Sequence, residues 1–403
     1  MEHPLIIYAG PFSFPHGGAA ARRVEGNAKS LAAAGFPVEV WSGQMPHDGP
    51  HPQVGNQSRA AEAISVRSLG ERTAEHRSRF VKHLHYVGMG RSLVRALEAE
   101  KRAICAVILY SGYTPYLQRL LAWSRKSGVP VAFDAVEWYD PPRATDWLTD
   151  PYYWNTEYAM RRLAPRCRNT IAISRRLENY FSGAGCHTVR IPPTLDVDAV
   201  EQGPAVRDHE APLVLSYTGS PGHKERLGSL IAALIRLGPE ASAIKVVIAG
   251  VTAEEVLALP DVMALSIKTL PPQVTALGRI AHSEALALTR NADFSVMLRP
   301  SKRYAEAGFP TKTVESLAAG TPVFGNLSSD LGDHLRDGET AVLTASTCVD
   351  AVMDGLKRLL ATPRHTLAPM RRAARREAAR AFDYRVYVPA FASFVEHLAT
   401  PQR

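Results

Sequence analysis

The sequence predicts an α/β protein built from two doubly wound, Rossmann-like domains. Its 403 residues are too many for one ordinary core and suit two domains of roughly 200 residues each. Runs such as LIIYAG and IKVVIAG are apolar almost throughout, as expected for parallel strands that helices cover on both faces. Such runs alternate with helix-length stretches along the chain, which indicates a doubly wound sheet in each half.

Strand-like runs follow one another at intervals that leave room for a helix. In the first half they are LIIYAG (5–10), VEVWSG (38–43), ISVRSL (64–69), AVILYSG (106–112), PVAFDAV (130–136), NTIAIS (169–174) and TVRIPP (188–193). In the second half they are LVLSYTG (213–219), IKVVIAG (244–250), SIKTL (266–270), ADFSVMLR (292–299), PVFGN (322–326) and AVLT (341–344).

The boundary between the two halves is expected within residues 191–212, IPPTLDVDAVEQGPAVRDHEAP, which are rich in proline and acidic residues. Asp196 and Asp198 in this segment have the Asp-x-Asp spacing of some metal sites. Because they follow two prolines in a linker, we expect them to be structural and predict no metal site.

The C-terminal residues 370–399 are expected to form two helices. The first is rich in alanine and arginine. The second has apolar residues that could form one face, namely Val386, Phe391, Phe394, Val395 and Leu398.

Composition excludes several classes of protein. Hydrophobic and charged residues make up 46% and 21% of the chain, as in globular proteins. No apolar run approaches the roughly 20 residues that span a bilayer, and the start MEHPLIIYAG lacks the basic segment of a signal peptide. The cysteines have no paired spacing, so neither a zinc site nor a disulfide framework is expected. We therefore expect a cytoplasmic protein.

The net charge of +8 lies entirely in the first half of the chain. Residues 1–190 contain 24 Lys and Arg against 16 Asp and Glu, whereas residues 191–403 contain 23 of each. This asymmetry predicts an acidic partner for the first half, such as an anionic membrane at the inner face or a phosphorylated substrate. Solvated arginine side chains are the alternative. Nucleic acid is not expected, because basic and aromatic residues do not interleave.

Open α/β sheets bind ligands beyond the carboxyl ends of their strands, so the loops there are the places to search. The first such loop, GPFSFPHGGAAARR, follows LIIYAG. Gly17 and Gly18 would let the backbone approach a ligand, and the helix that follows presents free N–H groups to an anion. His16 beside them is a candidate acceptor contact. A flexible turn is the alternative, since neither a dinucleotide fingerprint nor a P-loop occurs.

The loop SYTGSPGHKERLGSLIAAL repeats this layout in the second half, with Gly219 after the strand and a helix after the turn. Ser220, Gly222 and Lys224 could meet phosphate oxygens through a hydroxyl, a backbone N–H and an ammonium group. Lys224 is thus a candidate diphosphate ligand. The alternative for Lys224 is an exposed helix residue without a specific role.

A third loop lies in GFPTKTVESLAAGTPVFGN, residues 308–326. Pro310 suits the first turn of a helix, and Thr311 or Thr313 could help to cap it. Lys312 and Glu315 lie on one face of that helix, so Glu315 could take both hydroxyls of a ribose while Lys312 meets a phosphate. The alternative is a surface ion pair between the two, worth a few tenths of a kcal/mol.

Carboxylates and aromatic rings gather after the strand PVAFDAV, a combination that often binds sugars through hydrogen bonds and stacking. The set is Asp134, Glu137, Asp140, Trp138, Tyr139 and Trp147. We predict that Asp134 or Glu137 orients the acceptor or the donor ring. A solvated acidic loop with structural tryptophans is the alternative.

In this order the segments resemble a GT-B glycosyltransferase of the large retaining family, family 4-like and of group 1 type, that includes sucrose synthase and bacterial mannosyl- and N-acetylglucosaminyltransferases. The resemblance extends over most of the chain. It is carried by GGAAARRVEGNAKSLAAAG, NTIAISRRLENYF, RIPPTLDVDAV, GSPGHKERLGSLI, LGRIAHSEALALTRNADFSVMLR, GFPTKTVESLAAGTPVFGN and SSDLGDHLRDGETAVL.

The chain departs from the family pattern at two positions. The family has two glutamates separated by seven residues; Glu315 matches the second, whereas the first falls on Ala307 and Glu306 lies one residue early. The arginine that usually follows the glycine of the second-domain loop is Ser220. Lys224 resembles the diphosphate lysine, and we expect Lys312 to supply the missing positive charge.

The resemblance implies an acceptor-binding domain in residues 1–192 and a nucleotide-sugar domain in residues 193–383 that face each other across a cleft. The C-terminal helix, residues 384–403, is expected to cross back to the first domain. The predicted donor-binding residues are Gly17, Gly18, Gly219, Ser220, Gly278, Arg279, Gly308, Phe309, Pro310, Thr311, Lys312, Thr313 and Glu315. Catalytic roles are predicted for Lys224, Asp134 and Glu137, and acceptor contacts for His16, Trp138 and Tyr139.

The implied reaction moves a sugar, with retention and without a metal or cofactor, from a UDP- or GDP-type sugar to a saccharide or lipid-linked acceptor in polysaccharide biosynthesis. Cationic groups and backbone N–H groups would stabilise the departing diphosphate. The acceptor would attack from the leaving-group face. The alternatives are a glycosyltransferase for small natural products, a sugar-nucleotide-binding protein without activity, and a GT-B epimerase.

Overall fold

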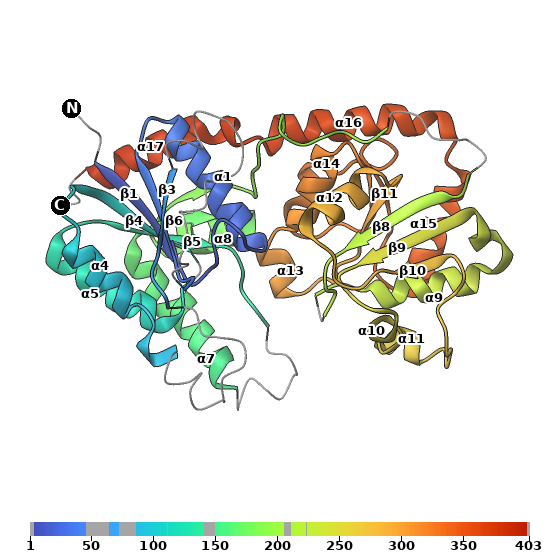
Figure 1. Cartoon of the computed structure of the whole chain (residues 1–403), viewed down its shortest axis with the longest axis horizontal. Coiled ribbons are helices and arrows are strands. Elements are labelled where there is room, and N and C mark those ends of the chain that lie inside the picture. Colours follow the sequence, from blue (N-terminus) through green and yellow to red (C-terminus); the bar gives the residue numbers. More distant parts are fainter. Residues whose placement is uncertain are drawn as a thin grey trace. The chain divides into compact units, whose positions relative to one another are not determined.

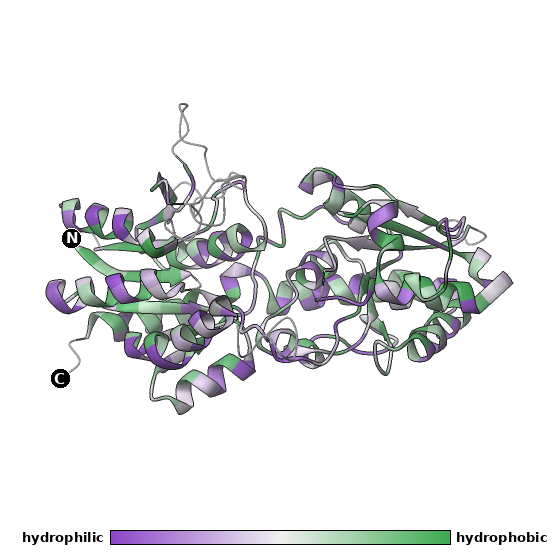
Figure 2. Cartoon of the chain, turned by 90° about the horizontal axis from the view of Figure 1, so that it is seen from below, coloured by the Kyte–Doolittle hydropathy of each residue, from purple (hydrophilic) through white to green (hydrophobic). Residues whose placement is uncertain are grey.

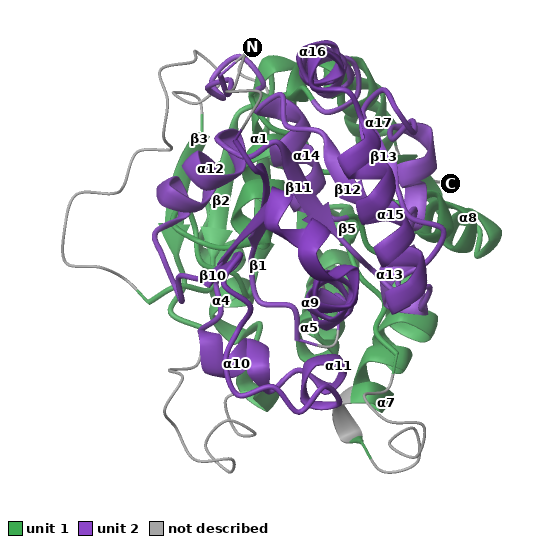
Figure 3. Ribbon diagram, turned by 90° about the vertical axis from the view of Figure 1, so that its right-hand side faces the viewer, with its two compact units in different colours: residues 1–196, 307–309, 383–403 green, residues 197–306, 310–382 purple. Residues whose placement is uncertain are grey.

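The computed structural model describes residues 4–45, 64–71, 86–110, 112–140, 150–204, 211–222 and 224–400. Trp147 lies outside these residues, as do residues 205–210 of the expected linker. The chain divides into two compact units (Figure 3). Unit 1 comprises Met1–Asp196, Ala307–Phe309 and Asp383–Arg403, and unit 2 comprises Val197–Glu306 and Pro310–Phe382.

Unit 1 is built on a seven-stranded parallel sheet with the order β3-β2-β1-β4-β5-β6-β7. The strands are β1 (Leu5–Gly10), β2 (Val38–Ser42), β3 (Ile64–Ser68), β4 (Ile104–Tyr110), β5 (Val131–Ala135), β6 (Asn169–Ala172) and β7 (His187–Arg190). The helices are α1 (Ala19–Ala33), α4 (Arg91–Ala99), α5 (Thr114–Ser127), α7 (Pro151–Tyr158), η1 (Ala159–Leu163), η2 (Ala164–Cys167), α8 (Arg175–Gly183), η6 (Tyr384–Tyr387) and α17 (Val388–Ala399).

Unit 2 is built on a six-stranded parallel sheet with the order β10-β9-β8-β11-β12-β13. The strands are β8 (Leu213–Thr218), β9 (Ile244–Ala249), β10 (Val274–Ala276), β11 (Phe294–Met297), β12 (Val323–Gly325) and β13 (Ala341–Leu343). The helices are α9 (Leu227–Leu237), η3 (Gly238–Ala243), α10 (Ala253–Leu257), α11 (Pro260–Met263), α12 (His282–Arg290), α13 (Arg303–Ala307, whose last residue groups with unit 1), α14 (Thr311–Ala318), η4 (Ser329–Asp333), α15 (Val349–Ala361), η5 (Arg364–Thr366) and α16 (Leu367–Ala381).

Helices cover both faces of each sheet, which confirms the doubly wound α/β fold (Figure 1). In unit 2, α9 packs with α11 and α15, while α14 packs with α12 and α16. The central strands are mostly hydrophobic, the edge strands β3 and β7 contain polar and partly exposed residues, and the helices turn a hydrophilic side outward (Figure 2). This is the burial pattern that predicted parallel strands from continuous apolar runs.

The C-terminal helix α17 belongs to unit 1, as predicted, although it follows the last helix of unit 2 in the chain. It packs against α1 and β4 (Figure 1). Phe391, Phe394, Val395 and Leu398 are buried and form its apolar face. Val386 is 46% exposed and lies before the helix begins, so its predicted place on this face is wrong.

The predicted strand at residues 266–270 is wrong. This segment forms turns and bends, and Ser266 has φ 54°, a left-handed conformation that interrupts an extended chain. The strand of this region is β10, which is only three residues long. A run that short contains too few residues to show an apolar pattern in the sequence.

Among the described helices, none combines the length and the hydrophobicity that crossing a bilayer requires.

Candidate active site

The strand order of unit 2 changes direction between β8 and β11, which lie side by side in the sheet. The connection that follows β8 runs to one side of this point. The connection that follows β11 runs to the other side. Open α/β sheets bind their ligands at the carboxyl ends of the strands at such a place. Gly219 directly follows β8, and Arg299 lies two residues beyond β11.

Three glycines join the loops at this edge of the sheet. Gly219 donates its N–H to Ala249 O at 2.8 Å, and Gly250 donates to Gly278 O at 2.7 Å. Gly219 has φ +127°, and a Cβ at Gly250 would lie 2.6 Å from Gly219 O. Neither position therefore admits a side chain without strain. Of the predicted donor residues, Gly219 and Gly278 lie at this edge, and Arg279 next to them is exposed.

The rest of the β8–α9 loop forms a tight turn. The Ser220 side chain is exposed, and its hydroxyl donates to Gly250 O at 3.3 Å. Lys224 is half-buried, and its backbone N–H donates to Pro221 O at 2.9 Å. The N-cap residue of α9 is Arg226, whose side chain makes no capping bond, and no acidic residue occupies the first turn. The electrostatics of this helix start therefore favour an anion.

The segment after α13 places Gly308, Phe309 and Pro310 in buried positions immediately before α14. Pro310 is the N-cap residue rather than a residue of the first turn, and no side chain makes a capping bond. The prediction that Thr311 or Thr313 helps to cap the helix is therefore wrong. Thr313 is buried, and its N–H bonds to Pro310 O at 3.0 Å.

Lys312 lies against the loop after β8. Its ammonium is 2.5 Å from Glu225 Oε2 and 4.3 Å from the ring centre of Tyr217, and a Cβ at Gly219 would be 3.1 Å from Nζ. Tyr217 donates its hydroxyl proton to Glu225 as well. Burial, and then the charge of Glu225, raise the pKa of Tyr217 well above its ordinary value. The ion pair of Lys312 is thus with Glu225, not the surface pair with Glu315.

The family pattern has a glutamate at each of two positions, which in this chain are Ala307 and Glu315. Glu315 lies in α14 and is 9% exposed. Ala307 is buried. Glu306 accepts a hydrogen bond from the Ser329 N–H at 3.2 Å, which holds it at the start of η4. Glu306 is the residue that would have to replace the first glutamate of the family pattern. It already makes a structural hydrogen bond with the start of η4.

In unit 1, Asp134 is part of a closed hydrogen-bond network. It is fully buried; Arg23 Nη2 donates to Oδ1 at 2.6 Å, and the Tyr8 hydroxyl donates to Oδ2 at 2.5 Å. Arg23 also donates to Ile191 O at 3.0 Å, and Asn27 donates to the Tyr8 oxygen at 2.9 Å. Because both carboxylate oxygens are used and covered, this geometry favours a structural role for Asp134 over direct contact with a substrate.

Electrostatics within this network are consistent with a tight ion pair. Burial alone would lower the pKa of Arg23, but the neighbouring Asp134 carboxylate outweighs it and the pKa is raised. Burial raises the pKa of Tyr8 well above its ordinary value, and Asp134 adds to this. Both shifts favour the state with Arg23 charged and Tyr8 neutral.

The remaining candidates of unit 1 have different environments. Trp138 is buried; its Nε1 donates to Glu157 at 2.8 Å and its ring meets Tyr180 at 4.6 Å, so it packs within the unit. Glu137 and Tyr139 are half-buried. Both are therefore less enclosed than Trp138.

The glycine turn before α1 is exposed. Gly18 is the N-cap of α1, and a Cβ at Gly17 would lie 2.4 Å from Ser13 O, so Gly17 is needed for the turn itself. His16 is also exposed. These three residues lie together at the start of α1, as the sequence predicted.

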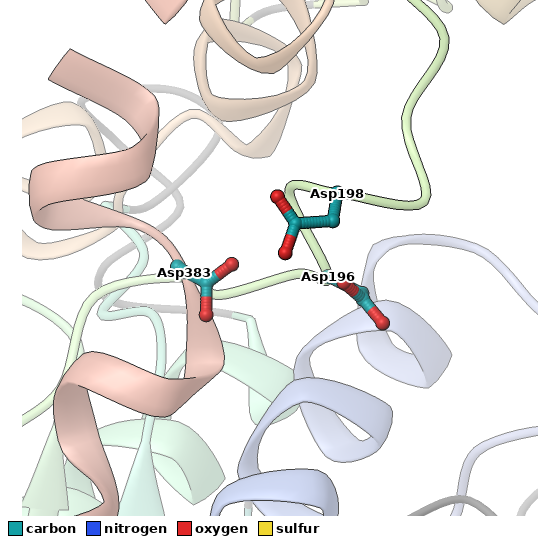
Figure 4. A group of neighbouring side chains, drawn as sticks. All are labelled: Asp196, Asp198 and Asp383. Carbon is teal, nitrogen blue, oxygen red and sulfur yellow. The ribbon is translucent and has the colours of Figure 1, made fainter. Parts of the chain in front are cut away.

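Acidic residues near the point where the chain leaves unit 1 form ion pairs with an arginine. Figure 4 shows Asp196, Asp198 and Asp383, and the carboxylates of Asp196 and Asp383 both pair with Arg385, at 3.0 and 2.9 Å. One arginine thus offsets part of the charge of this group. The three candidate ligand atoms lie within 4.8 Å of one another, so the absence of a metal site at Asp196 and Asp198 stays a prediction.

Sequence reasoning missed Glu225, Arg299 and Tyr304. Glu225 follows Lys224 in the same loop, but its pairing with a lysine 87 positions away leaves no sequence signal. Arg299 did carry one, because a charged residue just beyond an apolar strand lies at the edge where ligands bind.

Comparison with known proteins agrees with this architecture. The family model for group 1 glycosyl transferases matches residues 212–362, which belong to unit 2 except for Ala307–Phe309. A search of curated proteins finds no match. Sucrose-phosphate synthase from Thermosynechococcus elongatus has a similar structure, with a TM-score of 0.70 and 17% identity over 98% of each chain.

Two further structures are similar over the whole chain. Anabaena HepE, solved with UDP and glucose, has a TM-score of 0.64 and 15% identity over 99% of this chain and 100% of its own. The α,α-trehalose 6-phosphate synthase of Burkholderia multivorans has a TM-score of 0.65 and 13% identity over 100% of both chains. At such identities the structures establish the fold. They show that this chain has the GT-B fold, and its residues 212–362 match the group 1 glycosyl transferase model.

Proposed function

We propose that this protein is a retaining, metal-independent glycosyltransferase that moves a sugar from a nucleoside-diphosphate sugar to a saccharide or lipid-linked acceptor. One observation carries the proposal: the loop after β8 and the start of α14 meet at Gly219 and Lys312. They meet at the carboxyl edge of the sheet, within the residues that match the family. HepE was solved with UDP and with UDP-glucose, so UDP sugars are the first donors to test.

Different residues of unit 2 bind different parts of the donor. Glu315 holds the ribose hydroxyls, and the backbone around Gly219 together with the start of α9 receives the diphosphate. Lys224 stabilises the negative charge that builds on the diphosphate as the bond to the sugar breaks. Lys312, already paired with Glu225, holds the loop in place rather than acting as a free cation.

The acceptor is assigned to unit 1. The sequence up to residue 190 carries the net charge of +8, which suits an acceptor with phosphate or one at an anionic membrane. Glu137 and Tyr139 are the remaining candidates for contacts with its hydroxyls and rings. The acceptor hydroxyl attacks from the face that the diphosphate leaves, and an oxygen of the β-phosphate takes its proton.

A donor panel tests this proposal. Wild-type protein and Lys224→Ala are incubated with UDP-, GDP- and dTDP-sugars, and the release of nucleoside diphosphate and free sugar is measured. We expect slow hydrolysis of one donor class by the wild type and a loss of about 100- to 1,000-fold in the variant, by analogy with the removal of an oxyanion donor. Near-normal turnover by Lys224→Ala would overturn its assignment.

The same panel separates the alternatives. Binding of a sugar nucleotide without turnover, with or without acceptors, indicates a binding protein, and Ala307 in place of a glutamate is the feature that favours it. An epimeric sugar nucleotide as the product indicates an epimerase. Transfer to a small aglycone but to no saccharide indicates a natural-product enzyme.

Metal independence and stereochemistry need separate measurements. We expect turnover in EDTA to equal turnover with added Mg²⁺, because cationic side chains and N–H groups neutralise the diphosphate. The anomeric configuration of the product, followed by NMR, should match that of the donor. Inversion, or loss of activity in EDTA that Mg²⁺ restores, would contradict the corresponding part of the proposal.

A further inference from the structure

The side chain of Arg299 occupies an unusual position at the carboxyl edge of unit 2. It is 7% exposed and follows β11, at the point where the strand order changes direction. The side chain of Asn326 binds both backbone polar groups of Arg299. The Arg299 N–H donates to Asn326 Oδ1 at 2.9 Å, and Asn326 Nδ2 donates to Arg299 O at 2.8 Å. The backbone of Arg299 is therefore held in place, and its side chain is almost wholly buried.

Within the described residues, no carboxylate balances the charge of this guanidinium. Its Nε and Nη1 atoms are buried and have no hydrogen-bond partner. The guanidinium lies over the ring of Tyr304, with Arg299 Cζ 5.9 Å from the ring centre. An arginine stays charged when buried, and a buried charge without a partner is costly to keep. An anion that bound beside the guanidinium would accept hydrogen bonds from these two donors and balance the buried charge.

The surroundings of Arg299 are those of the donor loop. The residue before it, Leu298, accepts a hydrogen bond from the Arg226 N–H at 2.8 Å. Burial raises the pKa of Tyr304; Arg299, Arg226 and Lys224 act to lower it and Glu225 to raise it, so these charged residues of the β8–α9 loop and Arg299 all act on the same phenol. Lys312, also nearby, pairs with Glu225 at 2.5 Å.

We propose that Arg299 binds the diphosphate of the nucleotide sugar and supplies the guanidinium that Ser220 does not. This inference rests on the proposed function. Its fork of N–H donors can hold two phosphate oxygens at once, which an ammonium group cannot do with the same geometry. The anion thus meets a cation from the β11 end of the sheet together with Lys224 from the β8–α9 loop.

Calorimetric titration of four proteins tests the inference: wild type, Arg299→Met, Arg299→Lys and the control Arg236→Met. Arg236 is an exposed residue of α9 that pairs with Asp350 at 2.9 Å. The ligands are UDP, GDP, the two nucleosides and inorganic pyrophosphate. We expect Arg299→Met to weaken binding of the preferred diphosphate about 10- to 100-fold, as for the loss of charge-assisted hydrogen bonds. Arg299→Lys should fall in between, and the control should bind as the wild type does.

The nucleosides show whether the effect is specific. We expect Arg299→Met to bind the nucleoside as the wild type does, and an equal loss for nucleoside and diphosphate would overturn the inference. The thermal midpoint of ligand-free Arg299→Met should be no lower than that of wild type, because the substitution removes an unpaired buried charge. A lower midpoint combined with an undiminished rise on adding the diphosphate would also overturn it.

The outcomes distinguish this inference from the proposed function. If the wild type binds UDP or GDP and Arg299→Met binds it equally well, the role of Arg299 is refuted and the donor class stands. If the wild type binds pyrophosphate through Arg299 but no nucleoside diphosphate, the anion site stands and the nucleotide-sugar assignment falls. If it binds none of these ligands, both fall.

Discussion

Replacing Asp134 by asparagine separates a structural from a catalytic role for this residue. Asparagine has nearly the same shape, but it removes the negative charge and turns one acceptor into a donor. Arg23 would then keep its charge in a buried position without the carboxylate that now lies 2.6 Å away. The Tyr8 hydroxyl, 2.5 Å from Oδ2, could also face a donor instead of an acceptor.

The expected loss follows from these contacts. Removing one partner of a buried ion pair costs about 3–5 kcal/mol, because the other charge stays desolvated. With a shift of about 2–4 °C per kcal/mol for a domain of this size, the melting midpoint of unit 1 should fall by about 6–20 °C. This loss is a large fraction of the about 5–15 kcal/mol that stabilises a typical domain.

Scanning calorimetry and urea unfolding measure the effect, and turnover is compared well below the lower midpoint. Glu98→Gln is the matched control, since Glu98 is an exposed residue of α4 in the same unit and should change stability little. The double variant Arg23→Met with Asp134→Asn should regain part of the loss, because it removes both charges. A shift under about 1 °C for Asp134→Asn combined with a 100-fold loss of turnover would refute the structural role.

Three further predictions concern unit 2. Lys224→Ala should lower turnover about 100- to 1,000-fold with little change in the melting midpoint, and equal turnover would contradict its role on the diphosphate. Gly219→Ala should destabilise the protein by about 1–3 kcal/mol and weaken UDP binding, because φ is +127° and the new methyl group would meet Lys312; unaltered urea unfolding would contradict this. For Glu377, burial alone would raise the pKa, but hydrogen bonds from His334 and Arg380 lower it. The carboxylate therefore stabilises the fold above its unfolded pKa of about 4.3 and loses this contribution as the pH falls through the lower folded value, so the stability difference between wild type and Glu377→Gln should shrink below about pH 4.

The alternation of apolar runs with helix-length stretches was enough to predict the fold class. Continuous apolar runs such as Leu5–Gly10 report burial on both faces, and burial depends mainly on the local composition of the strand. The same reasoning failed for β10, which has three residues, and for residues 266–270, where a single left-handed residue prevents an extended chain. Pattern reasoning is reliable only where the element is long enough for the pattern to repeat.

The sequence by itself determined the positions of the candidate loops, because the carboxyl end of each parallel strand lies at one edge of the sheet. Only the tertiary structure decided which charges in and near those loops are already used. Lys312 pairs with Glu225, Asp134 is enclosed by Arg23 and Tyr8, and Arg299 has no counter-charge among the residues that the structure describes. The physical reason is that an ion pair forms between side chains brought together by packing. Its partners can be any distance apart in the chain, so their spacing carries no sequence signal.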